Sequence, residues 1–246
     1  MSELSGKVAL VTGGSRGIGA EIIRTLARNG AAVGLTYHSA ADQAQDLVKE
    51  IQANGGRALA IQADSADPEA VRASVEATAA EFGRFDILVN NAGVFPSGPL
   101  EEVALEDLDR TLAIHVRSVF IAAQAAARHM TDGGRIVNIG SCLTERLPGP
   151  GMTLYAMSKS ALKGLTKGLA RDLGPRGITA VVVDPGPTDT DMNPATGPAA
   201  DFLRDFIPLG HYGHTQDIAG MVAYLAGPGG RHVTGTSILV DGGFTA

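Results

Sequence analysis

The sequence is poor in the features that mark secreted, membrane-spanning and nucleic-acid-binding proteins. It has one cysteine, Cys142, which excludes an intramolecular disulfide. No stretch approaches the roughly 20 consecutive apolar residues that a transmembrane helix needs, so we expect no membrane association. The net charge of −6 and the pI near 5.5 argue against a nucleic-acid surface, which would carry a basic patch.

The N-terminal residues 1–7 lack the apolar core of a signal peptide. Together with the single cysteine, this predicts a cytoplasmic protein. Cys142 directly follows Ser141, which raises the question of a nucleophilic thiol, but no motif of a cysteine enzyme surrounds it. We therefore expect Cys142 to pack beside a site rather than to react in it.

Hydrophobic residues make up 44% of the 246 residues and charged residues 19%, values typical of a globular protein with a sizeable core. Seven short apolar runs alternate with longer helical segments, and no linker or repeat divides them. The runs lie at 8–11, 32–36, 58–61, 87–89, 136–139, 178–183 and 238–240. Because strands that alternate with helices pair in parallel through right-handed crossovers, we predict one doubly wound α/β domain. Its seven-stranded parallel sheet would carry helices on both faces.

A glycine-rich turn at residues 12–19 follows the first predicted strand and leads into a helix. Gly13, Gly17 and Gly19 are spaced G-x-x-x-G-x-G, so the plain dinucleotide fingerprint G-x-G-x-x-G is not matched. A helix N-terminus after such a turn offers unpaired N–H groups and a partial positive charge to a pyrophosphate. A purely structural turn is the alternative, but the position between strand and helix favours phosphate binding.

The second predicted strand ends without the acidic residue that an NAD site uses for the ribose 2′-hydroxyl. His38 and Ser39 follow the strand instead, and Arg16 lies in the glycine turn. These side chains can hold a 2′-phosphate through charge and hydrogen bonds, which favours NADPH over NADH. NADH remains possible, since Arg16 could also be a solvated turn residue.

Tyr155 and Lys159 are four residues apart in a helical stretch, and Ser141 lies upstream after an apolar strand. Residues at this spacing share a helix face, so the ammonium of Lys159 would lie beside the phenol. A nearby cation favours the phenolate and would lower the pKa of Tyr155 from its usual value of about 10. The pair therefore predicts a proton-transfer site, although the same spacing occurs on many solvated helix faces.

These motifs, joined by Asn90-Asn91-Ala92-Gly93 and Pro185-Gly186, resemble the short-chain dehydrogenase/reductase family. They follow the family's order, and the resemblance covers essentially the whole chain. It implies a single Rossmann-type domain over residues 1–246 that moves a hydride between a nicotinamide cofactor and a carbonyl or alcohol. The branch it most resembles includes the 3-oxoacyl-[acyl-carrier-protein] reductases and many sugar, polyol and ketone reductases.

The resemblance also assigns roles to single residues. Tyr155 would be the general acid in reduction and the general base in oxidation, and Lys159 would tune it and hold the nicotinamide ribose. Ser141 would hydrogen-bond the substrate oxygen. The cofactor-binding positions would be Gly13, Ser15, Arg16, Gly17, Ile18, Gly19, Asp64, Ser65, Asn91, Ala92, Gly93, Tyr155, Lys159, Pro185, Gly186, Thr188 and Thr190. Asp64 also has ordinary turn chemistry as an alternative. No metal is expected.

Two positions depart from the family pattern. His115 stands where the family usually has an asparagine that holds a water on a proton path from the active-site lysine. A histidine, with an ordinary pKa near 6.5, could be a fourth catalytic residue and relay that proton, or it could be a helix residue satisfied by the backbone. Val181 replaces a frequent asparagine in the strand before Pro185, and we expect only a structural consequence.

The family places a substrate lid in the segment corresponding to residues 190–214, with the Pro- and Gly-rich residues 143–152 as the opposite wall. The predicted lid mixes apolar residues with turns, and Arg204 is its one cation outside the histidines. We therefore expect reduction of an uncharged ketone or aldehyde, or oxidation of the matching alcohol. The alternatives are epimerisation or dehydration at the same site, and a catalytically weak nucleotide-binding or regulatory protein.

Helical stretches at 105–130 and 153–173 are similar to those that pair subunits in this family. Residues 237–243 match a further C-terminal contact. The resemblance thus implies a homo-oligomer, a tetramer or a dimer.

Overall fold

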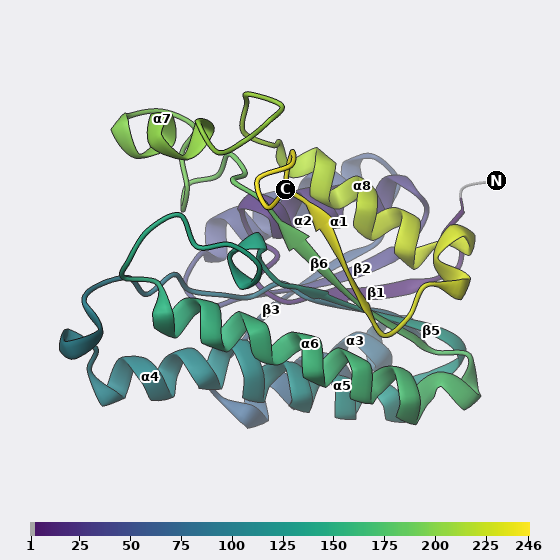
Figure 1. The fold of residues 1–246 in the computed structure, drawn as a ribbon. Coiled ribbons are helices and arrows are strands. Elements are labelled where there is room, and N and C mark those ends of the chain that lie inside the picture. Colours follow the sequence, from purple (N-terminus) through teal and green to yellow (C-terminus); the bar gives the residue numbers. More distant parts are fainter. Residues whose placement is uncertain (1–2) are drawn as a thin grey trace.

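Seven parallel strands form one continuous sheet in the computed structural model, which describes residues 3–246 (Figure 1). The strands are β1 (Val8–Val11), β2 (Ala32–Tyr37), β3 (Ala58–Gln62), β4 (Phe85–Asn90), β5 (Met130–Ile139), β6 (Thr179–Pro185) and β7 (Thr236–Val240). Their order is β3-β2-β1-β4-β5-β6-β7. Every predicted strand is present, and the predicted doubly wound, single-domain fold is confirmed.

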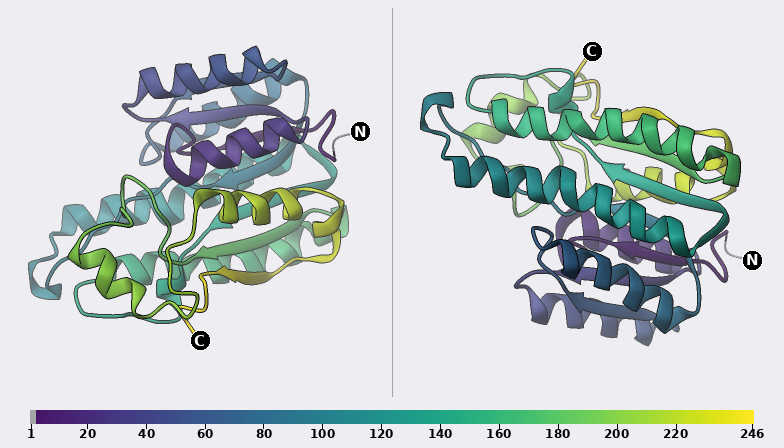
Figure 2. Two further views of the ribbon diagram at one scale, coloured as in Figure 1. Left: turned by 90° about the horizontal axis from the view of Figure 1, so that it is seen from above. Right: turned by 90° about the horizontal axis from the view of Figure 1, so that it is seen from below.

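Helices cover both faces of the sheet (Figure 1). They are α1 (Gly17–Arg28), α2 (Ala41–Ala53), α3 (Pro68–Phe82), α4 (Leu105–Leu112), α5 (Ser118–His129), α6 (Thr153–Leu173), α7 (Pro198–Arg204) and α8 (Thr215–Ala226). One layer contains α1, α2 and α8, and the other contains α3, α5 and α6. Figure 2 shows α7 at the opposite end of the molecule from the N-terminus.

The core follows the two-residue period of the strands. In β1, Ala9 and Val11 pack into the apolar cluster beneath α1, α2 and α8. Leu10 points the other way, into the cluster beneath α3 and α5. Both faces of β1 are therefore buried, which is why the strand reads as an unbroken apolar run. Among residues 3–246, no helix is both long enough and apolar enough to span a membrane.

The predicted helical stretch at 105–130 is not continuous. Residues Ala113–Arg117 form a turn of π-helix between α4 and α5. Such a turn inserts one extra residue and is frequent at functional sites. Here it contains His115, whose side chain is buried.

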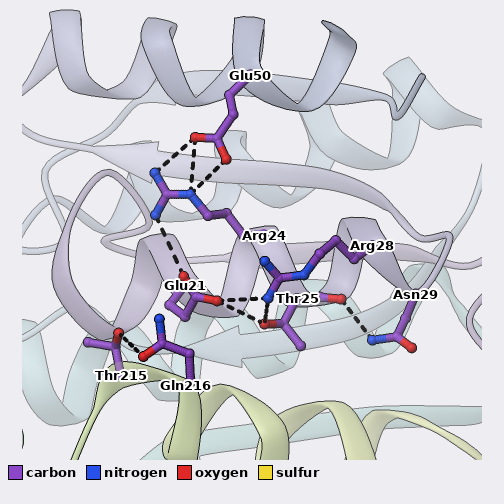
Figure 3. A network of polar contacts seen from close by, with 8 residues as sticks. All are labelled: Glu21, Arg24, Thr25, Arg28, Asn29, Glu50, Thr215 and Gln216. Carbon is purple, nitrogen blue, oxygen red and sulfur yellow. Dashed lines mark hydrogen bonds and ion pairs between the residues drawn. The ribbon is translucent and has the colours of Figure 1, made fainter. Parts of the chain in front are cut away.

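A polar network fixes α1 against α2 on the outer surface (Figure 3). The guanidinium of Arg24 binds Glu50 of α2 through Nε and Nη2, at 2.9–3.0 Å. Glu21, itself buried, accepts from Arg28 at 2.8 Å. The network holds the helix whose N-terminus forms part of the site described next.

Candidate active site

The predicted site residues lie along one edge of the sheet, where the strands end. Because all seven strands are parallel, their carboxyl ends meet at this edge. Residues 12–19 follow β1, His38 and Ser39 follow β2, Asp64 and Ser65 follow β3, Asn91, Ala92 and Gly93 follow β4, Ser141 follows β5, and Pro185 to Thr190 end and follow β6. Tyr155 and Lys159 come from α6, which packs against β6.

The glycine turn has a backbone that only glycine adopts readily. Gly13 and Gly17 have φ angles of +63° and +54°. A Cβ on Gly19 would lie 2.3 Å from the carbonyl oxygen of Gly13, so the turn closes tightly on the start of α1. The Arg16 side chain does not cap α1, and the first N–H groups of that helix remain available to an anion. These features fit a pyrophosphate.

Asn91 is part of the turn's scaffold. Its side-chain Nδ2 donates to the carbonyl oxygens of Thr12 and Gly13, at 3.0 and 2.9 Å. The backbone N–H groups of Asn91 and Ala92 both donate to Thr12 Oγ1. The resemblance implies that Asn91 binds the cofactor, but in this structure its side chain holds the loop after β4 against the glycine turn.

The residues expected to hold a 2′-phosphate lie in the turn after β1 and at the end of β2. Arg16 is exposed and lines a hollow of about 320 Å³ together with Ser15 and Gln43. His38 Nε2 lies 3.7 Å from the Asp64 carboxylate, so the ends of β2 and β3 are linked. Asp64 also accepts from the N–H of Ala66 at 2.8 Å, the kind of turn contact considered as its alternative role.

Ser141 and Lys159 are buried, and Tyr155, from the same helix as Lys159, is half-buried. The ammonium of Lys159 donates to the carbonyl oxygen of Ile139 at 2.9 Å and lies 5.9 Å from the Tyr155 ring centroid. Ser141 Oγ accepts from the N–H of Leu143 at 3.2 Å, which leaves its hydroxyl proton free to donate.

The pKa values in this cluster differ from the sequence expectation. Burial raises the pKa of Tyr155 to about 12, and the Ser141 hydroxyl only partly opposes this. Burial also lowers the pKa of Lys159 to about 8, against the pull of the Asp184 carboxylate. The expected lowering of the Tyr155 pKa by Lys159 is not found, because the removal of the phenol from water has the largest influence on that pKa.

His115 has both ring nitrogens occupied. Nε2 accepts from the N–H of Val94 at 3.0 Å, and Nδ1 lies 2.8 Å from Ser158 Oγ. Since Nε2 is an acceptor, the proton is on Nδ1 and is donated to Ser158, whose hydroxyl donates to the carbonyl oxygen of Tyr155 at 2.8 Å. Burial, with Lys159 nearby, lowers the pKa of His115 to about 3. This geometry speaks against proton exchange by His115 and favours the alternative of a structural histidine.

The segment after β6 turns back on itself. Thr188 donates to the carbonyl oxygen of Gly186 at 2.9 Å, and Thr190 Oγ1 accepts from the N–H of Asn193 at 3.2 Å. A Cβ on Gly17 would lie 3.6 Å from Thr190, so the segment that follows β6 comes close to the glycine turn. This brings the two ends of the expected cofactor-binding set together.

Cys142 and Val181 have packing roles. Cys142 lies in a cluster with Ile207, Tyr212 and Phe244, and burial raises its pKa to about 12. The expectation that it packs beside the site is confirmed. Val181 is fully inside the sheet core, which agrees with a structural consequence only.

Two residues that sequence reasoning passes over lie at this site. The Phe95 ring, 43% exposed, packs edge-on against the Tyr155 ring with centroids 4.7 Å apart. Asp184 is completely buried and accepts from the N–H of Ser141 at 2.8 Å. Phe95 is separated from the Asn-Ala-Gly loop by Val94 alone. A search for apolar residues beside known motifs would find this position.

Comparisons with known proteins decide the family. A family model described as Enoyl-(Acyl carrier protein) reductase matches residues 13–245. A short chain dehydrogenase from Burkholderia cenocepacia, solved in complex with NADP, is 57% identical over 99% of this chain and 100% of its own, with a TM-score of 0.98. This chain belongs to the short-chain dehydrogenase/reductase family of oxidoreductases.

Other members of the family differ in what they are named for. A blue fluorescent protein from a metagenomic library, solved in complex with NADPH, is 61% identical over 99% of this chain and 100% of its own, with a TM-score of 0.97. A cyclic-di-GMP-binding biofilm dispersal mediator protein of Escherichia coli is 46% identical over the full length of both chains. Family membership alone therefore leaves the substrate open.

Proposed function

We propose that this short-chain dehydrogenase/reductase is an NADPH-dependent enzyme that reduces an uncharged ketone or aldehyde to the alcohol, reversibly. The observation that carries the proposal is the cluster of Ser141, Tyr155 and Lys159 at the same sheet edge as the glycine turn. A binding protein has no chemical need for a phenol beside a buried ammonium and a hydroxyl.

The cofactor assignment rests on chemistry at two places. The N-terminus of α1 suits the pyrophosphate, and Arg16, Ser15, His38 and Ser39 would hold the 2′-phosphate. The complexes of the Burkholderia and metagenomic relatives with NADP and NADPH support this choice. Thr188, Thr190 and the Pro185-Gly186 turn would hold the nicotinamide end.

When bound, the nicotinamide supplies the hydride. Ser141 donates a hydrogen bond to the substrate oxygen, keeps its own proton, and stabilises the negative charge that grows there. Tyr155, protonated at working pH, gives its proton to the same oxygen. Lys159, whose Nζ lies 5.9 Å from the centroid of the Tyr155 ring, would hold the ribose hydroxyls. His115 acts by position, since it ties the loop at Val94 to α6 through Ser158.

The substrate class follows from the walls of the site. Phe95 lies on Tyr155, and Leu147, Met192 and Phe202 are exposed on the two segments expected to flank the substrate. Arg204 already binds Asp201 and the carbonyl oxygen of Ala195, at 2.6 and 2.8 Å. With that guanidinium engaged, residues 190–214 favour an apolar, uncharged carbonyl compound and would act as its lid.

A screen of ketones, aldehydes and secondary alcohols tests the proposal. Cofactor oxidation is followed at 340 nm with NADPH and, in parallel, NADH. We expect turnover of apolar ketones or aldehydes with NADPH at a kcat/KM at least about tenfold above that with NADH. No turnover of any compound despite measurable NADPH binding would reject the reductase.

A second candidate is a nucleotide sensor, which the name of the Escherichia coli relative favours. It predicts that cyclic di-GMP binds this chain and competes with NADPH. Calorimetric titration of cyclic di-GMP with and without saturating NADPH would detect this. Binding without carbonyl turnover would favour the sensor, and turnover without binding would favour the reductase.

We further propose a cytoplasmic homo-oligomer. The outer surface of α4 and α5 has a hollow of about 870 Å³ lined by Leu112, Val116 and Phe120, and Phe120 is 54% exposed. Such an apolar surface suits a second copy of the chain. Light scattering should give a dimer or tetramer mass, and Phe120→Glu should lower it, whereas a monomeric wild type would contradict the proposal.

A further inference from the structure

A buried carboxylate lies directly behind Ser141. Asp184, near the end of β6, has no exposed surface, and its Oδ1 accepts from the backbone N–H of Ser141 at 2.8 Å. The fit is so close that a Cβ on Gly140 would lie 2.0 Å from the same oxygen. The residue before Ser141 thus has to lack a side chain for the carboxylate to reach the serine backbone.

The second carboxylate oxygen has no hydrogen-bond donor among the described residues 3–246. Its nearest cation is Lys163, whose Nζ is 3.9 Å away. Lys163 lies one turn beyond Lys159 on α6 and also pairs with Glu145, in the turn that follows Ser141. Asp184 is therefore an anion with an incomplete set of partners, enclosed between the strand that bears it and the helix that bears Tyr155.

Burying the Asp184 carboxylate costs free energy that its neighbours only partly offset. Burial raises the pKa of Asp184, while the Ser141 N–H, Lys163 and Lys159 lower it and Glu145 raises it. An asparagine of the same shape would avoid the buried charge. A purely structural role does not require the negative charge of Asp184. We therefore look for the use of that charge in the groups beside the carboxylate.

We propose that Asp184 is a positioning residue with two effects: its carboxylate fixes the backbone of Ser141, and its charge acts on Lys159, whose Nζ is held by the carbonyl oxygen of Ile139, two residues before Ser141. The inference rests on the proposed function, since Ser141 and Lys159 are the groups it serves. Asp184 touches no substrate. The Ser141 N–H, Lys163 and Lys159 each favour the carboxylate form of Asp184 against its burial, and Asp184 in turn opposes the loss of the Lys159 proton that burial favours.

The titratable and charged groups that face Asp184 come from two elements other than its own strand. Lys159, Lys163 and Tyr155 are on α6, Glu145 and Cys142 are in the turn after β5, and Asp184 itself is on β6. Since Asp184 raises the pKa of Lys159, neutralising it should lower that pKa from about 8. The neutral lysine would then predominate at a lower pH.

Asp184→Asn and Asp184→Ala separate the two effects. Asparagine keeps an oxygen that can accept from Ser141 but removes the charge, and alanine removes both. With NADPH and a carbonyl from the screen, we expect the alkaline fall of kcat to move down by about one pH unit in both variants. The alanine variant should also lose about tenfold more kcat than the asparagine variant, because Ser141 loses its anchor.

Asp172→Asn, an exposed carboxylate near the end of α6, is the matched control and should keep the wild-type profile. If Asp184→Asn keeps the wild-type alkaline limb, the charge effect is wrong. If both Asp184 variants have the same kcat, the anchoring of Ser141 is wrong. Should Asp184→Ala not fold, Asp184→Asn alone decides the charge effect, and Asp184→Ser, too short to reach the serine, replaces alanine.

The same measurements on Tyr155→Phe distinguish this inference from the function it rests on. Full activity in Tyr155→Phe would reject the proposed proton donor whatever Asp184 does. Loss of activity in Tyr155→Phe with no effect in the Asp184 variants would reject only the role of Asp184.

Discussion

Two buried aspartates at opposite ends of the parallel strands have pKa values shifted in opposite directions. Asp86, at the start of β4, is 4% exposed and accepts from Arg84, Lys7 and the N–H of Val8, at 2.6–3.1 Å. Burial alone would raise its pKa, but these donors together hold the pKa below its ordinary value. Asp184, near the end of β6, has one hydrogen bond and a raised pKa.

The difference teaches where this fold can tolerate an incompletely paired charge. At the amino ends of the strands, both carboxylate oxygens of Asp86 have donors, and those from Lys7 and Val8 tie the start of β1 to β4. At the carboxyl ends of the strands, only one oxygen of Asp184 has a hydrogen-bond donor among the described residues, and that donor is the N–H of Ser141. Active sites often retain such costs, which stability elsewhere offsets.

The largest expected effect on stability comes from Asp86→Ala. It leaves the Val8 N–H unpaired and two cations without their anion, so we expect a loss of about 2–4 kcal/mol in the free energy of unfolding. Urea unfolding at pH 7 measures it, with Asp172→Asn as the control. The activity per folded molecule should be retained. A loss of activity without a loss of stability would contradict a purely structural Asp86.

Gly140→Ala is the next largest change and acts at the other edge. Its methyl group would displace the Asp184 carboxylate, so we expect about a tenfold fall in kcat with little change in the KM for NADPH. Gly164→Ala in α6 is the matched control, because no atom lies within 4 Å of the added Cβ and alanine favours the helix. Equal kcat values in Gly140→Ala and Gly164→Ala would show that displacing the Asp184 carboxylate does not affect the function of Ser141.

The pH dependence of reduction should report Lys159. Its pKa of about 8 means that kcat falls as pH rises through 8, once the lysine loses its proton. His115, with a pKa of about 3, should add no limb between pH 5 and 8. Initial rates from pH 5 to 10 measure both, and Lys159→Met should remove the alkaline limb. A limb near 6.5 that disappears in His115→Asn would restore the proton relay.

The contributions of Asp86 and Asp184 to the free energy of unfolding should depend on pH with opposite signs. The folded pKa of Asp86 is lowered, so its contribution is present above the unfolded pKa and is lost as pH falls through the folded value. The folded pKa of Asp184 is raised, so ionising it destabilises the fold as pH rises above the unfolded pKa. Asp184→Asn should therefore melt at pH 7 no lower than wild type. A clearly lower Tm would show that Asp184 stabilises.

The smallest effect on stability is expected at the surface ion pair of Arg24 and Glu50, which is joined by three hydrogen bonds. Arg24→Ala or Glu50→Gln should cost less than about 1 kcal/mol, because water screens both groups. A double-mutant cycle by urea unfolding measures the coupling. A coupling energy as large as the loss in Asp86→Ala would mean that burial does not explain why the carboxylates of Asp86, Asp184 and Glu50 differ in their effects on stability.

The sequence predicts the fold and the place of the site because both depend on local patterns. Apolar runs and turns mark the seven strands, and parallel strands bring their carboxyl ends together. The sequence does not mark Asp184, because its partner Ser141 is 43 residues away and its strand is otherwise apolar. For the same reason, the ring contacts of His115 with Val94 and Ser158, which bear on its protonation, emerge only once the π-helical turn is seen.

The proton donor is the central claim, and Tyr155→Phe tests it most directly. NADPH binding, followed by cofactor fluorescence, and carbonyl turnover are measured on the same sample, with the exposed Tyr224→Phe as the control. The account predicts unchanged Tyr224→Phe and, in Tyr155→Phe, NADPH affinity within about threefold of wild type with kcat lowered at least about 100-fold. A Tyr155→Phe enzyme that binds NADPH and turns over at the wild-type rate would contradict it.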